Sequence, residues 1–338
     1  MKKCCFLIVW LILHLHALAV EGDSLIHVTY RWDCLGKERQ CSLDVSQRLY
    51  DYYRNQRKHL AYYYEDSGYG SAESYCGFMF SEYSRDVIKS LAEQLMVSAL
   101  SHKEKIMAAL SFVQSLKYVL DEESKAQEEY VRYPVETLVD GEGDCEDKTA
   151  LLAALLKEMG EDFVIIILPD HLALGVQCDA ADHTNPIKYD GKTYYYVEST
   201  TPKWAIGQIP SEYASSSFEV AHWISSPVLV LKKSWFESRS YSVWSEATCK
   251  VILQMFNLGP GRSTGIKAHW EILERKRRKW KLLAQGDSYL DDMQEGEERI
   301  DTIPFQGVIG DKSRLRVVLS SNASRDQIVE IDLYSKSR

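Results

Sequence analysis

Residues 141–160 read GEGDCEDKTALLAALLKEMG, a glycine-rich acidic turn followed at once by an apolar run. Asp144 is a residue type that caps helix N-termini, and acidic side chains on both sides of Cys145 favour a first helical turn. The closing glycine is typical of a helix end. The stretch therefore predicts a helix over about 145–159 with Cys145 in its first turn.

The position of Cys145 predicts a reactive thiol. Backbone N–H groups and the dipole at a helix N-terminus favour the thiolate and lower the pKa of a cysteine there. Asp144, Glu146 and Asp147 oppose this effect, because nearby negative charge favours the neutral thiol. We therefore expect a cationic group close to the sulfur. The alternative is an inert structural cysteine.

Three strands are expected after this helix. The β-branched run 163–168 is typical of a buried strand, 171–176 follows a Pro-Asp turn, and an Asp-Gly hairpin turn leads into 193–200. His171 begins the second of these strands and Glu198 ends the third. Cys145, His171 and Glu198 then supply a thiol, a base and a group that orients the base, as thiol-dependent acyl transfer requires.

The segments GEGDCED, PDHLALGV and YYYVESTTP, in this order, resemble the core motifs of the transglutaminase-like superfamily. YPVETL before GDCED, with FVQ and Tyr118 upstream, makes the chain similar to a bacterial and archaeal branch over about 25–230. The resemblance implies a papain-like fold and a catalytic site of Cys145, His171 and Glu198. It departs from the family in two places: the acid is usually aspartate, and an aromatic residue often follows the histidine, where this chain has Leu172.

The resemblance leaves the reaction open, because the superfamily includes cross-linking acyl transferases, peptidases, amidases and inactive members. We expect an exported thiol hydrolase or acyl transferase that acts on an amide bond of a protein, peptide or cell-wall substrate. The alternative is a non-catalytic adhesion or assembly protein with a degenerate domain. The backbone N–H of Cys145 is the expected first oxyanion donor. Gln114 and Tyr133 are candidates for the second, and a solvated helix position is the better interpretation of Gln114.

Metal sites receive little support from the sequence. Cys145, His171 and Cys178 lack the ligand spacing of zinc sites. The polar segment 179–183 lacks the ordered pattern of a calcium loop. The prediction is therefore an enzyme without a metal or cofactor.

Residues 1–19 predict a secretory signal peptide: Lys2 and Lys3 precede an apolar stretch over 4–18 that ends in a small-residue cleavage signal. The alternative is an uncleaved membrane anchor, for which the stretch is short. No later stretch is long and apolar enough to predict a membrane span. The chain's net charge is −9, and loss of the two lysines makes it −11, which argues against a nucleic-acid partner. The sequence predicts a secreted or periplasmic protein.

The expected fold class is α+β: a papain-like core, with the cysteine-bearing helix on an antiparallel sheet, followed by an immunoglobulin-like β-sandwich. We assign residues 20–102 to strands and helices packed on the core, 103–235 to the catalytic core and 241–338 to the sandwich. The sandwich is expected either to bind an envelope partner, through turns at 258–265 and 320–324, or to act as a spacer. Cys34 and Cys41 flank a predicted hairpin turn and are the best candidates for a disulfide.

Overall fold

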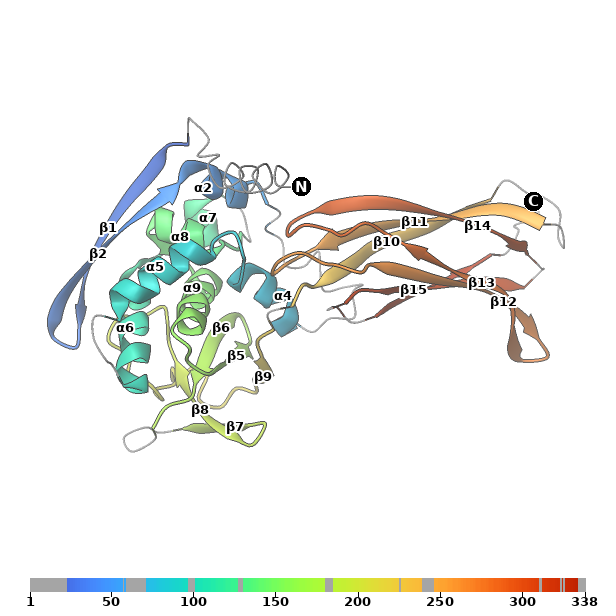
Figure 1. The fold of residues 1–338 in the computed structure, drawn as a ribbon. Helices are drawn as coiled ribbons and strands as arrows, with labels where there is room; N and C mark the ends of the chain where they lie inside the picture. The colour runs from blue at the N-terminus through green and yellow to red at the C-terminus, as the bar shows by residue number, and fades with distance from the viewer. Residues whose placement is uncertain are drawn as a thin grey trace, which may run out of the picture.

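A computed structural model describes residues 23–333 except 57, 59–70, 97–100, 127–129, 180–184, 225, 239–245, 310–311, 323 and 325. The chain forms a mixed helical and sheet part joined to an elongated part made of strands alone (Figure 1). The expected signal peptide lies outside the described residues. Among the helices that are described, none has the length and apolar character to cross a membrane.

The N-terminal segment forms a hairpin of β1 (Leu25–Cys34) and β2 (Lys37–Ser46). Its register pairs Cys41 with Tyr30 and Cys34 with Lys37, so the two cysteines do not face each other across the strands. Both thiols are free, and the expected disulfide is wrong for this structure. Helices then follow at Gln47–Arg54 (α2), Ser71–Met79 (α4) and Arg85–Leu95 (α5).

The cysteine-bearing helix α9 (Cys145–Glu158) lies at the centre of the first part. Asp144 caps it as the sequence predicts, in a reciprocal pair of hydrogen bonds with Asp147. Its residues from Ala150 to Leu156 are buried, because it packs on helices and on a sheet at once. The other elements of this region are α6 (His102–Ser115), β3 (Lys117–Tyr118), α7 (Asp121–Ser124), α8 (Pro134–Asp140) and β4 (Glu142–Gly143).

One face of α9 contacts a five-stranded antiparallel sheet. The strand order is β7 (Pro186–Tyr189), β8 (Lys192–Val197), β6 (His171–Val176), β5 (Phe163–Leu168) and β9 (Glu219–His222). The three strands expected from the sequence form its centre, and the two edge strands were not expected. β5 is almost wholly buried because both of its faces pack against other side chains, which explains its unbroken apolar sequence.

The second part is a sandwich of two antiparallel sheets. One sheet has the order β10 (Leu229–Ser238), β11 (Glu246–Asn257) and β14 (Glu298–Val308). The other has the order β13 (Lys279–Tyr289), β12 (Lys267–Lys276), β15 (Ser313–Ser320) and β16 (Gln327–Asp332). Because β10 pairs with β11, the sandwich begins at Leu229, and the expected boundary between 235 and 241 falls too late.

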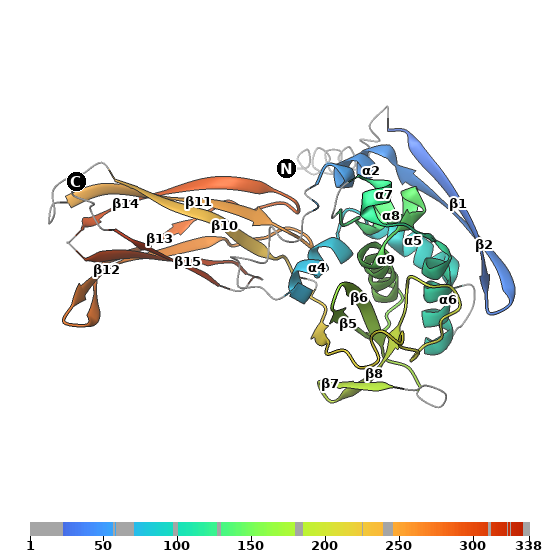
Figure 2. The ribbon, with the colours of Figure 1, turned by 180° about the vertical axis from the view of Figure 1, so that it is seen from behind.

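The two parts share a packed junction, where α4 faces the sandwich in both views (Figures 1 and 2). Leu258 is 1% exposed and packs on Gly77. A Cβ atom added to Gly77 would lie only 2.3 Å from the Cγ of Leu258. Tyr52 Oη donates to the backbone oxygen of Glu295 at 2.7 Å. The beginning of the 258–265 turn is therefore covered, while Arg262 and Gly265 of the same turn remain exposed.

Candidate active site

Two consecutive side chains near the start of α9 form hydrogen bonds to backbone oxygens of the neighbouring segments. Thr149 Oγ1 donates to the backbone oxygen of Leu172 at 2.9 Å. Lys148 Nζ donates to the backbone oxygens of Leu116 (2.9 Å) and Thr200 (3.2 Å). Both side chains are fully buried. These contacts hold the helix start against the beginning of β6 and the segment after β8, where the other two candidate residues stand.

Gln114 has a structural role that the sequence did not predict. Its amide is buried and donates to the backbone oxygens of Glu198 (2.8 Å) and Trp204 (3.2 Å), while its oxygen accepts from the Lys203 N–H at 3.1 Å. The solvated interpretation is therefore wrong, and these contacts leave the amide unsuited to an oxyanion. Tyr133 packs in the core on other aromatic rings.

His171 and Glu198 form a direct pair, with 3.1 Å between Nε2 and Oε2. Tyr196 Oη donates to the same carboxylate oxygen at 2.7 Å, and the Thr200 N–H and hydroxyl donate to the other at 2.9 and 2.6 Å. Burial acts to raise the pKa of Glu198, but the hydrogen bonds from His171 and Thr200 lower it to about 2. Glu198 is thus ionised and held from both sides.

These contacts account for a glutamate at the position where the sequence resemblance leads one to expect aspartate. The longer side chain reaches His171 while Tyr196 and Thr200, two residues before and after it, fix its carboxylate. Sequence reasoning missed both supports. The signal was available for Tyr196, because residues two apart on a strand share a face. Since Nε2 of His171 bonds to Glu198, Nδ1 is the nitrogen that remains for proton exchange with a thiol.

The surroundings of Cys145 favour the protonated thiol. The residue is 8% exposed, and its Sγ donates to Glu146 Oε2 at 2.7 Å. Burial raises the pKa of the thiol, and the carboxylates of Glu146 and Asp144 raise it further, while the Leu172 N–H acts in the opposite direction. The lowered pKa predicted from the helix start is therefore not found, because burial and the flanking acids outweigh the helix terminus.

A buried set of ion pairs around Arg132 stabilises the start of α9. Arg132 is fully buried, and its guanidinium pairs with Asp147 and, at 3.2 and 3.3 Å, with Asp121 and Asp140. Its backbone N–H also donates to Asp147 at 2.6 Å. Asp147 in turn completes the capping pair with Asp144. Removing one partner of such a buried pair is strongly destabilising, so this group fixes the backbone that carries Cys145.

Two tyrosines complete the surroundings of the thiol. The ring of Tyr213 stacks on that of His171 with 5.0 Å between centroids and 7° between planes. Tyr118 lies on β3 opposite Gly143 of β4, and burial, together with the negative charges of Asp144 and Glu146, raises its pKa to about 12. Tyr213 follows in a polar loop far from His171 in the chain, so no pattern in the sequence identifies it.

The donor atoms of Asp144, Cys145 and Glu146 lie within 4.8 Å of one another, and within the described ranges this is the group that could ligate a metal ion. His171 and Cys178, which completed the zinc alternative, do not belong to it. Most of the calcium alternative, including Asp182 and His183, lies outside the described residues.

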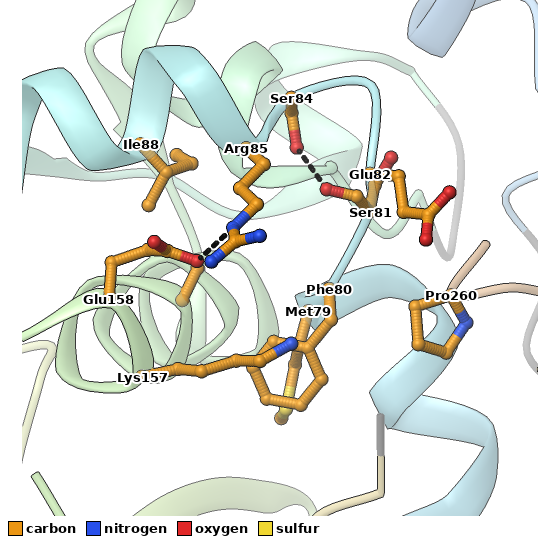
Figure 3. A pocket seen from close by; sticks show the side chains of 11 residues that line it. Met79, Phe80, Ser81, Glu82, Ser84, Arg85, Ile88, Lys157, Glu158 and Pro260 are labelled. Atoms are coloured by element: carbon orange, nitrogen blue, oxygen red, sulfur yellow. Dashed lines mark hydrogen bonds and ion pairs between the residues drawn. The ribbon is translucent and has the colours of Figure 1, made fainter. Parts of the chain in front are cut away.

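Two pockets of the described structure lie away from the candidate site. A cavity of about 230 Å³ opens at the junction with the sandwich, between α4, α5, the end of α9 and Pro260 (Figure 3). Arg85 Nε pairs with Glu158 at 3.0 Å on its wall, and the Lys157 ammonium lies 4.3 Å from the Phe80 ring centroid. This cavity has charges of both signs and includes no residue of the candidate site.

No protein-family model matches this chain, and no curated protein matches its sequence. Spo0M, a sporulation control protein of Bacillus subtilis, aligns over 33% of this chain and 49% of its own, with 13% identity and a TM-score of 0.18. Red sea bream transglutaminase aligns over 91% of this chain and 62% of its own, with 8% identity and a TM-score of 0.23. The chain thus spans less than two thirds of either protein, and both similarities are too distant to assign a family.

Proposed function

We propose that this protein is an exported thiol-dependent hydrolase or acyl transferase that acts on an amide bond. The observation that carries the proposal is the His171–Glu198 pair, in which a buried, ionised carboxylate holds one imidazole nitrogen. The backbone N–H of the next residue, Leu172, points at the Cys145 thiol on the facing helix. A thiol, an oriented imidazole and a carboxylate are the groups that acyl transfer through a thioester needs.

The reaction follows from these groups. Cys145 Sγ turns from Glu146, gives its proton to His171 Nδ1 and attacks the amide carbonyl carbon. Glu198 stabilises the resulting imidazolium through Nε2, and the backbone N–H of Cys145 donates to the developing oxyanion. The imidazolium then protonates the leaving amine, which departs as the thioester forms. Water or a second amine attacks the thioester carbonyl and gives a proton to His171; the C–S bond breaks, the carboxylic acid or new amide leaves, and the imidazolium returns the proton to the Cys145 thiolate.

One observation favours the alternative, a non-catalytic adhesion or assembly protein. The thiol is nearly covered and protonated, which is usual for an inert cysteine. The intact His171–Glu198 pair favours the enzyme, since an inert domain has no need of an ionised carboxylate bonded to an imidazole.

Alkylation with iodoacetamide at neutral pH separates the two functions. The enzyme predicts that Cys145 reacts faster than Cys178, which is more exposed, and that His171→Ala removes this advantage. An inert cysteine predicts that Cys145 reacts more slowly than Cys178 and is unaffected by His171→Ala. The rates are read by mass spectrometry of the peptides that carry each thiol.

We also propose export, from the apolar stretch 4–18 and its small-residue cleavage signal. The mature chain should begin at Val20, which N-terminal sequencing of the secreted or periplasmic protein would show. A retained Met1 in the purified native protein would contradict this. The sandwich is proposed to be a partner-binding accessory or a spacer at the envelope, and binding of the full chain to cell-envelope material separates these roles.

A further inference from the structure

The loop that carries Tyr213 covers the candidate base. Short hydrogen-bonded turns shape it: the Tyr213 N–H donates to the oxygen of Pro210, and the Ser216 N–H donates to the oxygen of Tyr213, both at 3.0 Å. Tyr213 is partly buried and packs against the cluster that contains Ala173 and Tyr196. The loop therefore has a fixed shape that places an aromatic ring over His171.

The contact between the two rings is nearly parallel, with centroids 5.0 Å apart. This is the range in which aromatic rings attract each other beyond simple burial. The Tyr213 ring covers one face of the imidazole, and Glu198 bonds to one edge of it. The side chain of His171 is left only 8% exposed. The imidazole plane is thus fixed by two contacts from different parts of the chain.

An aromatic face also has an electrostatic effect on a ring that gains a proton. A cation over the face of a tyrosine is attracted by the electron-rich ring, most strongly where water is excluded. His171 becomes such a cation when it takes the thiol proton in the proposed reaction. The stacked Tyr213 ring then stabilises the imidazolium and, with it, the thiolate.

We propose that Tyr213 is a positioning residue of this site, which holds the His171 ring in place and stabilises its protonated form. This role rests on the proposed function, because it matters only if His171 accepts the proton of Cys145. Tyr213 also gives His171 an aromatic neighbour from another segment of the chain. The two residues that follow His171, Leu172 and Ala173, are not aromatic.

The charged and titratable groups around these two rings come from several elements. They include Glu198 after β8, Tyr196 on β8, Asp170 before β6, Glu212 beside Tyr213, and Asp144, Cys145 and Glu146 at the start of α9. Substitution of Tyr213 by leucine changes none of them. A loss of Cys145 reactivity that Tyr213→Leu causes and Tyr213→Phe does not can therefore be assigned to loss of the ring.

The experiment measures alkylation of Cys145 by iodoacetamide from pH 5 to about pH 10, the upper limit chosen near the usual pKa of a lysine. The variants are Tyr213→Leu, which removes the ring, and Tyr213→Phe, which keeps it. Tyr189→Leu is a matched control, because Tyr189 forms another tyrosine–histidine contact in the same domain, with His222 at 4.9 Å. All variants are made in the full chain.

We expect Tyr213→Leu to slow alkylation at neutral pH by between about twofold and thirtyfold, the range that a cation–π contact implies. The loss should be absent in a His171→Ala background, where no imidazole is left for the ring to stabilise. Tyr213→Phe and Tyr189→Leu should stay within about twofold of the wild type.

An equal loss in the His171→Ala background, or no loss for Tyr213→Leu, would overturn the role of Tyr213 while leaving the proposed function in place. A wild-type Cys145 that reacts more slowly than Cys178, with no effect of His171→Ala, would instead remove the proposed function and this role with it. If Tyr213→Leu does not fold, Tyr213→Phe and Tyr213→Trp decide: both retain a ring, so a large loss in both contradicts the proposal.

Discussion

Glu146→Gln should make the cysteine more reactive, although it alters a residue in contact with the thiol. The carboxylate lies 2.7 Å from Sγ and favours the protonated thiol. Two unit charges about 4 Å apart interact by about 1 kcal/mol in water and about 4 kcal/mol at the effective dielectric constant of a protein surface. Loss of the charge should therefore lower the pKa of Cys145 by between about one and three units.

The expected gain in rate is smaller than the gain in thiolate. The thiolate fraction at neutral pH rises between about tenfold and a thousandfold, but a less basic thiolate is also a weaker nucleophile, which removes about half of the gain on a logarithmic scale. Alkylation of Cys145 by iodoacetamide should thus become between about threefold and thirtyfold faster.

The assay follows the Cys145 peptide by mass spectrometry at a fixed neutral pH. Glu158→Gln is the matched control, because it removes the same charge at the opposite end of the same helix. Glu146→Asp, which keeps the charge, should remain close to the wild type. A Glu146→Gln rate equal to or below that of the wild type would show that this carboxylate does not hold the thiol in its protonated state.

Two further predictions concern the carboxylate and the junction. The low pKa of Glu198 stabilises the fold above pH 4.5, and this contribution, at most roughly 3 kcal/mol, is lost as the pH falls towards 2. The free energy of unfolding in urea should therefore be lower for Glu198→Gln than for the wild type at neutral pH. The two values should converge at about pH 2. Gly77→Ala should destabilise the chain by about 1–3 kcal/mol and open the junction to proteolysis, because its Cβ would meet Leu258 Cγ at 2.3 Å. Gly175→Ala, crowded by Val164 within the sheet at 2.9 Å, should lower the melting temperature without exposing the junction, and equal proteolysis of both variants would contradict this.

Much of the fold follows from local sequence signals. The cap at Asp144, the apolar run after it and the β-branched strand at 163–168 indicate their elements because burial and capping act on neighbouring residues. Edge strands such as β9 were missed, since Glu219–His222 has no alternating pattern. The start of the sandwich at Leu229 was also missed. It depends on the pairing of β10 with β11, and a pattern within β10 alone cannot show which strand it pairs with.

In the candidate site, too, the sequence identified some features and missed others. Cys145, His171 and Glu198 are marked by their positions at the ends of predicted elements. The protonated state of the thiol was not predicted, because burial depends on the whole fold and outweighs the helix terminus. Tyr213 approaches His171 through a loop whose path no periodicity indicates. Sequence patterns identify residues on regular elements, while contacts made by loops and the balance of buried charges require the structure.

Capture of an acyl-enzyme on Cys145 tests the central claim most directly. The full chain is mixed with a library of peptide amides and activated esters, quenched in acid, and analysed by intact-mass and peptide mass spectrometry. We predict an added acyl group on the Cys145 peptide, absent from Cys145→Ala and strongly reduced in His171→Ala. Release of amine by Cys145→Ala at the wild-type rate, or an acyl group on another residue in both variants, would contradict the assignment of Cys145 as the nucleophile.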